Sequence, residues 1–115
     1  IKPAREARTR GNRFIRNNRQ ASVLIVRTPE TLSGQRHELN LEITIGRAAT
    51  CDVTIDDTYA SQIHARIFRR EGNHVLEDLG STNGTYLNRQ KVSSATTLRT
   101  GDHLQVGSTV FEVMS

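Results

Sequence analysis

Three groups of polar residues in the sequence have the types and spacing expected of an anion-binding site. Arg47 follows the apolar run 41–45 and the bend-permitting Gly46. Its planar guanidinium can bind a phosphate or a carboxylate through two parallel hydrogen bonds, which a lysine cannot reproduce. Ser61 can face an external ligand from a loop, while His64 packs inward and bonds to backbone groups. For Arg47 alone, an exposed arginine without a binding role is the simpler interpretation.

The third group, residues 80–85, has the sequence Gly-Ser-Thr-Asn-Gly-Thr between two apolar runs. Its small hydroxyl and amide side chains, Ser81, Thr82 and Asn83, lie on a turn whose backbone N–H groups can form an anion-binding concavity. The pair Asn83-Gly84 is also the strongest short signal for a β-hairpin, which is the purely structural interpretation.

Catalysis and metal binding find little support in the same residues. Ser61, His64 and Asp78 supply the residue types of a hydrolytic triad, but the sequence has no Gly-x-Ser-x-Gly motif to carry a nucleophile. The single Cys51 excludes an internal disulfide and a multi-thiolate zinc site. The four histidines and three neighbouring aspartates lack the spacings of zinc and calcium ligands; they are His37, His64, His74, His103, Asp52, Asp56 and Asp57. We therefore expect no enzyme activity, no metal and no cofactor.

The polar groups lie at the ends of short apolar runs that have the composition of β-strands. Six such runs, rich in β-branched residues and separated by turn formers, lie at 22–26, 41–45, 65–68, 74–79, 103–106 and 110–113. Leu41, Ile43 and Ile45 alternate with polar residues, which is the period of a half-buried strand. No segment after residue 20 has the sustained apolar period of an amphipathic helix. Many short strands in about 95 residues predict a β-sandwich.

The positive charge of the chain is confined to its first twenty residues. The 115 residues carry 16 Lys and Arg against 12 Asp and Glu, a formal net charge of +4. Residues 1–20 hold seven basic side chains and one acidic one, whereas residues 21–115 hold nine basic and eleven acidic ones. We therefore expect residues 1–20 to be a flexible basic arm or linker, and residues 21–115 to form one folded domain.

The ordered set of motifs resembles the forkhead-associated (FHA) domain. Its members are, in chain order, Gly46-Arg47, Ser61-x-x-His64, the run 78–88 (DLGSTNGTYLN), Gly101-Asp102 and Gly107. The run from Asp57 to Val92 is most similar to small actinobacterial FHA proteins that act with Ser/Thr kinases. The resemblance implies an all-β, FHA-type β-sandwich of about eleven strands, whose loops at one end bind phosphothreonine in a partner peptide.

The resemblance also assigns five residues to phosphopeptide binding: Arg47, Ser61, Gln62, Thr82 and Asn83. Arg47 and Ser61 would hold the phosphate, with Thr82 in support. Gln62 would add its backbone N–H, and Asn83 would bind the peptide main chain. Three further residues would be structural supports of the site: Gly46, His64 and Gly84. A phosphothreonine carries about −1.5 to −2 charge and three acceptor oxygens, which one arginine and several loop donors can satisfy without a large basic field.

The expected partners are threonine-phosphorylated proteins, which can include a Ser/Thr kinase, bound by a non-enzymatic and monomeric signalling module. No small-molecule substrate is expected. The alternative function is electrostatic binding to nucleic acid or to an anionic membrane surface through residues 1–20. No apolar run approaches the ~20 residues needed to span a bilayer. We expect a cytoplasmic location, or the cytoplasmic face of a membrane if an anchor precedes Ile1.

Overall fold

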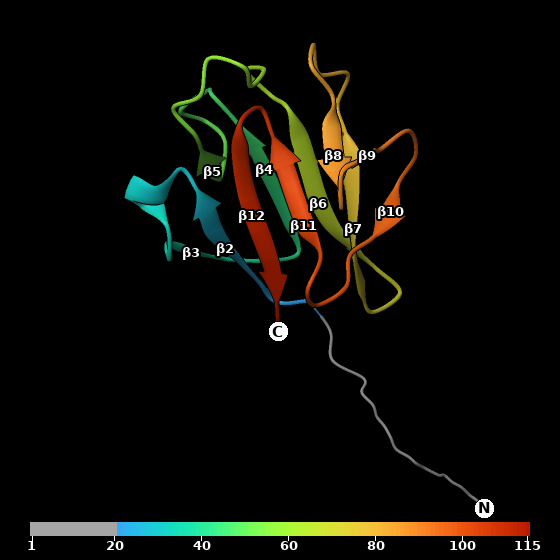
Figure 1. The fold of residues 1–115 in the computed structure, drawn as a ribbon. Helices are drawn as coiled ribbons and strands as arrows, with labels where there is room; N and C mark the ends of the chain where they lie inside the picture. Colours follow the sequence, from blue (N-terminus) through green and yellow to red (C-terminus); the bar gives the residue numbers. More distant parts are fainter. Residues whose placement is uncertain (1–20) are drawn as a thin grey trace, which may run out of the picture.

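Residues 21–115, the part of the chain that the computed structural model describes, fold into two β-sheets packed face to face (Figure 1). The five-stranded sheet has the order β10 (Thr96–Thr97), β7 (Asn73–Asp78), β6 (Ala65–Arg70), β4 (Glu42–Gly46), β5 (Val53–Thr54). The six-stranded sheet has the order β3 (Arg36–Glu38), β2 (Val23–Thr28), β12 (Thr109–Met114), β11 (His103–Val106), β8 (Thr85–Leu87), β9 (Gln90–Lys91). The predicted all-β sandwich of about eleven strands is confirmed. The predicted basic arm, residues 1–20, lies outside the described residues.

The six apolar runs of the sequence correspond to the six longer strands β2, β4, β6, β7, β11 and β12. One detail of the prediction is wrong: Leu41 was expected to alternate inward with Ile43 and Ile45, but its side chain is 77% exposed. The reason is that β4 begins at Glu42, so Leu41 precedes the strand at the end of the sheet, where only its carbonyl takes part in pairing by accepting the Arg69 N–H.

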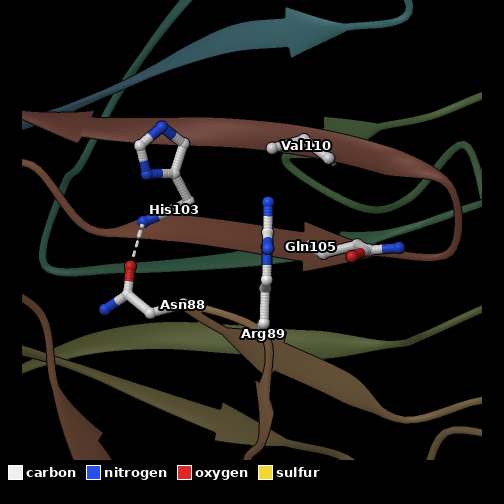
Figure 2. A pocket seen from close by; sticks show the side chains of 5 residues that line it. All are labelled: Asn88, Arg89, His103, Gln105 and Val110. Carbon is white, nitrogen blue, oxygen red and sulfur yellow. Dashed lines mark hydrogen bonds between the residues drawn. The ribbon is translucent and has the colours of Figure 1, made fainter.

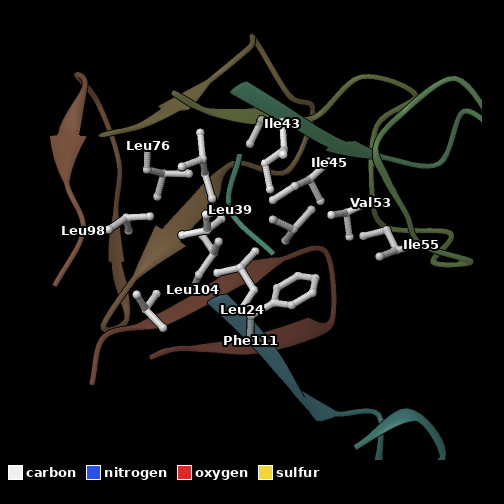
Figure 3. Packing of buried hydrophobic residues seen from close by; sticks show 14 of the residues in the cluster. Leu24, Leu39, Ile43, Ile45, Val53, Ile55, Leu76, Leu98, Leu104 and Phe111 are labelled. Carbon is white, nitrogen blue, oxygen red and sulfur yellow. The ribbon is translucent and has the colours of Figure 1, made fainter. Parts of the chain in front are cut away.

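The core lies between the two sheets and fixes which face of each strand points inward (Figure 3). Ile43 and Ile45 from β4 pack with Leu24 from β2, Leu104 from β11 and Phe111 from β12, and all five side chains are buried. Burying a large apolar side chain contributes about 1.5–3 kcal/mol. A one-residue slip of a strand would expose this set, so the core holds the strand ends, and the loops attached to them, in register.

The first and last described strands are neighbours, β2 pairing antiparallel with β12. The Ser22 N–H donates to the Met114 carbonyl at 2.8 Å, which closes this pair at its outer end. The C-terminus therefore lies at the opposite end of the sandwich from the β11–β12 turn (Figure 1). Between residues 21 and 115 the helical structure is a 3-10 turn, η1 (Glu30–Leu32), and no helix there is long and apolar enough to cross a membrane.

Candidate functional site

Three loops bring together polar residues that are far apart in the sequence. Arg47 begins the loop after β4, Ser61 lies in the loop before β6, and Thr82 and Asn83 lie in the loop between β7 and β8. The Arg47 N–H donates to the Ser61 carbonyl at 3.0 Å, which joins the first two loops. The Ser61 Oγ accepts the Thr82 N–H at 3.0 Å, which joins the second to the third. The three predicted polar groups therefore lie on adjoining loops at one end of the sandwich. We call this set of residues, Arg47, Ser61, Thr82 and Asn83, the rim.

The Arg47 side chain is anchored through one nitrogen of its guanidinium. Its Nε donates to the Ala60 carbonyl at 2.7 Å, and the residue as a whole is exposed. Within residues 21–115 no carboxylate forms an ion pair with Arg47. The two terminal nitrogens of the guanidinium can therefore form a bidentate pair of hydrogen bonds with a phosphate.

His64 connects the Ser61 loop to the Asn83–Gly84 turn from the buried side of the two loops. Its side chain is fully buried, with the Nδ1 atom accepting the Ser61 N–H at 3.0 Å. Because Nδ1 accepts, the ring proton lies on Nε2, which donates to the Gly84 carbonyl at 2.9 Å. Both ring nitrogens are thus used to hold backbone groups of the two loops.

The residue types of a hydrolytic triad are present but are not arranged as one. His64 bonds to the backbone of Ser61 rather than to its hydroxyl, and the Asp78 carboxylate bonds to Ser81 and Thr85 rather than to His64. Within the described part of the chain, the hydroxyl of Ser61 therefore has no general base in hydrogen-bond contact. Among residues 21–115 there is also no group of three His, Cys, Asp or Glu side chains placed to hold a metal ion.

Asn83 is exposed at the rim and tied to the neighbouring loop. Its Nδ2 donates to the Tyr59 carbonyl at 2.8 Å, which leaves the Oδ1 atom and the second N–H of Nδ2 available to a ligand main chain. Gly84, which follows it, has a φ of +87°, in the left-handed region that glycine adopts without strain. A glycine here lets the chain turn directly from Asn83 into β8.

Gly46 allows the Ser61 loop to approach the end of β4 closely. A Cβ atom added at Gly46 would overlap the backbone carbonyl of Gln62. That carbonyl accepts the Ala48 N–H at 3.0 Å and the Cys51 thiol at 3.3 Å. Gln62 is exposed and adjoins Ser61 at the rim.

Asp78 organises the loop that carries Thr82 and Asn83. Its carboxylate accepts the backbone N–H groups of Gly80 and Ser81, at 3.0 and 3.1 Å, and the side-chain hydroxyls of Ser81 and Thr85. Burial alone would raise the pKa of Asp78, but these hydrogen bonds outweigh it and hold the pKa below the ordinary value of 3.8. The carboxylate is therefore ionised at neutral pH and fixes both ends of the turn.

Asp57 is a second organiser, and sequence reasoning missed it because it treated this residue only as a candidate metal ligand. Its buried carboxylate accepts the Tyr59 N–H at 2.9 Å, the Ser108 N–H and hydroxyl at 2.8 and 3.0 Å, and the Thr109 hydroxyl at 2.8 Å. Burial alone would raise the pKa of Asp57, but the hydrogen bonds from Thr109, Tyr59 and Ser108 outweigh it and lower the pKa. This carboxylate joins the Tyr59–Ser61 loop to the β11–β12 turn of the other sheet.

Comparison with known proteins identifies the family. The family model of the FHA domain matches residues 43–107, the segment that contains all three loops of the rim. The chain belongs to the FHA-domain family. Among its relatives, the FHA domain-containing protein FhaB of Mycolicibacterium smegmatis is 41% identical over 99 residues, which is 85% of this chain and 64% of FhaB. The chain thus spans less than two thirds of the length of this relative.

Solved FHA structures share the same sandwich. One comes from a structural and functional analysis of phosphothreonine-dependent FHA domain interactions; it is 28% identical, with a TM-score of 0.75 over 84% of this chain and 97% of that one. Another is EmbR of Mycobacterium tuberculosis in complex with a low affinity phosphopeptide; it is 28% identical, with a TM-score of 0.74 over 83% of this chain and 24% of EmbR. Of these two similar structures, that of EmbR is a complex with a phosphopeptide.

Proposed function

We propose that this FHA domain binds phosphothreonine in a partner protein and so recruits threonine-phosphorylated proteins in Ser/Thr kinase signalling. The observation that carries the proposal is the rim itself, where the exposed guanidinium of Arg47, the hydroxyl of Ser61 and the exposed turn at Asn83 lie on hydrogen-bonded loops. The phosphopeptide in the EmbR complex and the phosphothreonine-dependent interactions of the other solved FHA domain support the same ligand class.

Each residue of the rim has an unused hydrogen-bonding group that suits a phosphopeptide. The terminal nitrogens of Arg47 would take two phosphate oxygens. The Ser61 oxygen already accepts the Thr82 N–H, so its own O–H is available to donate to a third oxygen. The backbone N–H of Gln62 would add a donor, and the Oδ1 of Asn83 would accept a main-chain N–H of the peptide. The rim binds and orients the phosphate, and no covalent step is part of the proposal.

We also propose that residues 21–115 carry this binding as one domain, with residues 1–20 as a separate basic segment. The partners would be threonine-phosphorylated proteins, which can include a Ser/Thr kinase, and we expect the protein to meet them in the cytoplasm. The alternative function, electrostatic binding to nucleic acid or anionic lipid, rests on residues 1–20, which lie outside the described structure, and stays a sequence-based prediction.

Isothermal titration calorimetry with paired peptides tests the proposal. A phosphothreonine peptide should bind, and the same peptide with unmodified threonine should not. Arg47→Ala should cost about 2–5 kcal/mol of binding free energy, as removal of one member of a hydrogen-bonded charge pair does. Arg36→Ala, which removes an exposed arginine from β3, is the matched control and should leave binding unchanged. Equal affinity of wild type and Arg47→Ala for the phosphopeptide would contradict the assignment.

A further inference from the structure

The end of the sandwich opposite the rim carries Leu41, the most exposed large apolar side chain between residues 21 and 115. The Leu41 carbonyl accepts the Arg69 N–H at 2.9 Å, which places this leucine beside the last residues of β6. Because β6 begins next to the rim at Ala65 and advances about 3.3 Å per residue, its far end lies about 17 Å from the rim. A single exposed leucine is ordinary, so its neighbours decide whether it belongs to a contact surface.

Three exposed arginines lie at the same end of the five-stranded sheet. Arg69 is opposite His74 in the β6–β7 pair, and the His74 carbonyl accepts the Leu98 N–H at 2.9 Å. Arg70 and Arg99 directly follow Arg69 and Leu98 in the chain, so all three arginines are carried by one row of hydrogen-bonded strand ends. We call the exposed residues of this end the basal surface: Leu41, Arg69, Arg70 and Arg99.

The arginines of the basal surface have hydrogen-bond donors to offer to an anionic partner. Within residues 21–115 none of the three forms an ion pair. The Arg70 guanidinium lies over the ring of Phe68, 5.2 Å from its centroid, a contact that leaves the N–H groups free. Glu42, at the start of β4, is already paired with Arg66 at 3.3 Å. Glu71, in the turn after β6, offsets one of the three positive charges.

The loop that carries Arg99 is held in a fixed position. The Asp102 carboxylate accepts the Arg99 N–H at 2.8 Å and the Asn88 Nδ2 at 3.0 Å. Asn88 is in turn bonded to the start of β11, where its Oδ1 accepts the His103 N–H at 2.9 Å (Figure 2). The Asp102 carboxylate is therefore occupied by neutral donors, and the guanidinium of Arg99 extends from a loop that is tied to two strands of the other sheet.

The basic N-terminal segment joins the domain at this same end. The Nδ1 of His74 donates to the carbonyl of Ala21, the first described residue, at 2.7 Å. Ala21 also lies beside the C-terminus, because the Ser22 N–H bonds to the Met114 carbonyl (Figure 1). Residues 1–20 hold seven basic side chains and one acidic one, whereas residues 21–115 hold nine basic and eleven acidic ones. The excess positive charge of the chain is therefore attached next to the basal surface and far from the rim.

We propose that the basal surface docks on an anionic membrane, with Leu41 in the lipid interface and the three arginines at the phosphate headgroups. An apolar side chain among cationic ones is the combination that binds such an interface, where the apolar group leaves water and the cations meet anionic lipid. Residues 1–20 would add electrostatic attraction beside the point of contact. Nucleic acid would be attracted by the arginines but would gain little from an exposed leucine, so the surface favours lipid.

This inference goes beyond phosphothreonine recognition and predicts how the domain is oriented. With the basal surface on the membrane, the rim at the other end of β6 and β7 faces away from the lipid. The two ligands therefore occupy opposite ends of one rigid sandwich and bind at the same time.

Co-sedimentation of the full 115-residue chain with lipid vesicles tests the docking. Wild type should bind vesicles of phosphatidylcholine with about one third phosphatidylglycerol at least tenfold more tightly than vesicles of phosphatidylcholine alone. Leu41→Ser should lower the affinity for the anionic vesicles about tenfold and change the affinity for duplex DNA by less than about twofold. Arg69→Gln should lower the affinity for the anionic vesicles about fivefold.

Two matched controls remove the same residue types elsewhere on the domain. Leu32→Ser replaces another exposed leucine, in η1 at the rim end, and Arg36→Gln replaces an exposed arginine on the edge strand β3. Both should bind the anionic vesicles within about twofold of wild type. Leu41→Ser should also unfold in urea at the wild-type concentration, because its side chain makes little contact with the core.

Fluorescence anisotropy of a labelled phosphothreonine peptide tests the orientation. The peptide should bind with equal affinity, within about twofold, with and without a saturating amount of anionic vesicles. Wild type that does not prefer anionic vesicles, or Leu41→Ser that binds them as tightly as wild type or no less tightly than Leu32→Ser, overturns the docking. Loss of peptide binding on addition of vesicles overturns the proposed orientation. Peptide binding in the absence of vesicles tests the proposed function separately, so the failure of one proposal is distinguishable from the failure of the other.

Discussion

Replacement of Asp57 by asparagine tests whether one buried carboxylate links the rim to the six-stranded sheet. The carboxylate accepts four hydrogen bonds, from Tyr59, Thr109 and twice from Ser108, and asparagine keeps its size but has one acceptor oxygen and an NH₂ group. That NH₂ would face donors, which leaves at least one buried donor without a partner. Hydrogen bonds to charged groups contribute about 1.5–3 kcal/mol each, and not additively.

We therefore expect Asp57→Asn to lower the free energy of unfolding by about 2–4 kcal/mol. For a domain of this size the total is about 5–14 kcal/mol, so the loss is large but leaves a folded protein. Binding should weaken as well. The loop that Asp57 holds supplies the Tyr59 carbonyl to Asn83 and the Ala60 carbonyl to Arg47, so a looser loop misplaces both rim residues. We expect the affinity for a phosphothreonine peptide to fall about tenfold.

Urea unfolding followed by circular dichroism measures the free energy of unfolding of Asp57→Asn. Calorimetry on the folded variant measures its affinity for the phosphothreonine peptide. Asp56→Asn is the matched control: the neighbouring carboxylate is exposed, and its loss should change stability by less than about 0.5 kcal/mol. A double-mutant cycle with Thr109→Val should show a coupling of about 1 kcal/mol or more, because the two side chains share a buried hydrogen bond. An additive cycle, or an Asp57→Asn variant as stable as Asp56→Asn, would refute the reasoning.

Three further predictions concern two aspartates, Gly46 and the β8–β9 turn. The pKa values of Asp57 and Asp78 are lowered in the folded protein, so the stability that these two carboxylates give the fold is complete above their ordinary pKa of 3.8 and is lost as the pH falls below it. The urea concentration at the midpoint of unfolding should therefore decrease below about pH 4. Gly46→Ala should cost about 1–3 kcal/mol in thermal unfolding and weaken phosphopeptide binding, because the added methyl group displaces the Gln62 carbonyl. Arg89→Asn should raise the free energy of unfolding by about 0.5–1 kcal/mol in urea titrations, since asparagine relieves the strain of the positive φ.

Each of these predictions has an outcome that contradicts it. A midpoint that does not change between pH 5 and pH 3 would show that the two aspartates are not stabilised as carboxylates. A fully stable Gly46→Ala with normal binding would show that the loop can move without consequence. An Arg89→Asn variant less stable than wild type would mean that the arginine side chain stabilises the turn more than its backbone strain destabilises it.

Alternation and strand propensity were sufficient to predict the longer strands, because those strands bury one face against the other sheet. The prediction for β11 at 103–106 has the same ends as the strand in the structure. Strands of two or three residues, such as β5 and β10, are too short to show a period, and their pairing is decided by the neighbouring strands. Leu41 shows the limit of alternation as a signal, because the alternating pattern begins one residue before the strand does.

The residue types of the rim could be found in the sequence, but its connections could not. Arg47 stands out because it follows an apolar run and Gly46, whereas Ser61 and Asn83 stand out as small polar residues in the segments between runs. The hydrogen bond from the Thr82 N–H to Ser61 spans 21 residues, and the one from Ser108 to Asp57 spans 51. Contacts at such separations depend on how the two sheets are stacked, and no local pattern encodes them.

The pairing of β2 with β12 also determines how the domain responds to tension. The two strands are antiparallel, and the start of β2 and the end of β12 lie side by side, joined by the bond from Ser22 to Met114. A force that pulls the two ends apart therefore loads the hydrogen bonds of this pair one at a time, beginning with that bond, rather than all together in shear. A small force would therefore separate β12 from β2, one hydrogen bond after another. Once β12 is displaced, Ser108 and Thr109 would no longer bond to Asp57. Tension applied at Ser22 and Met114 would thus disorder the phosphate-binding loops at the opposite end of the sandwich.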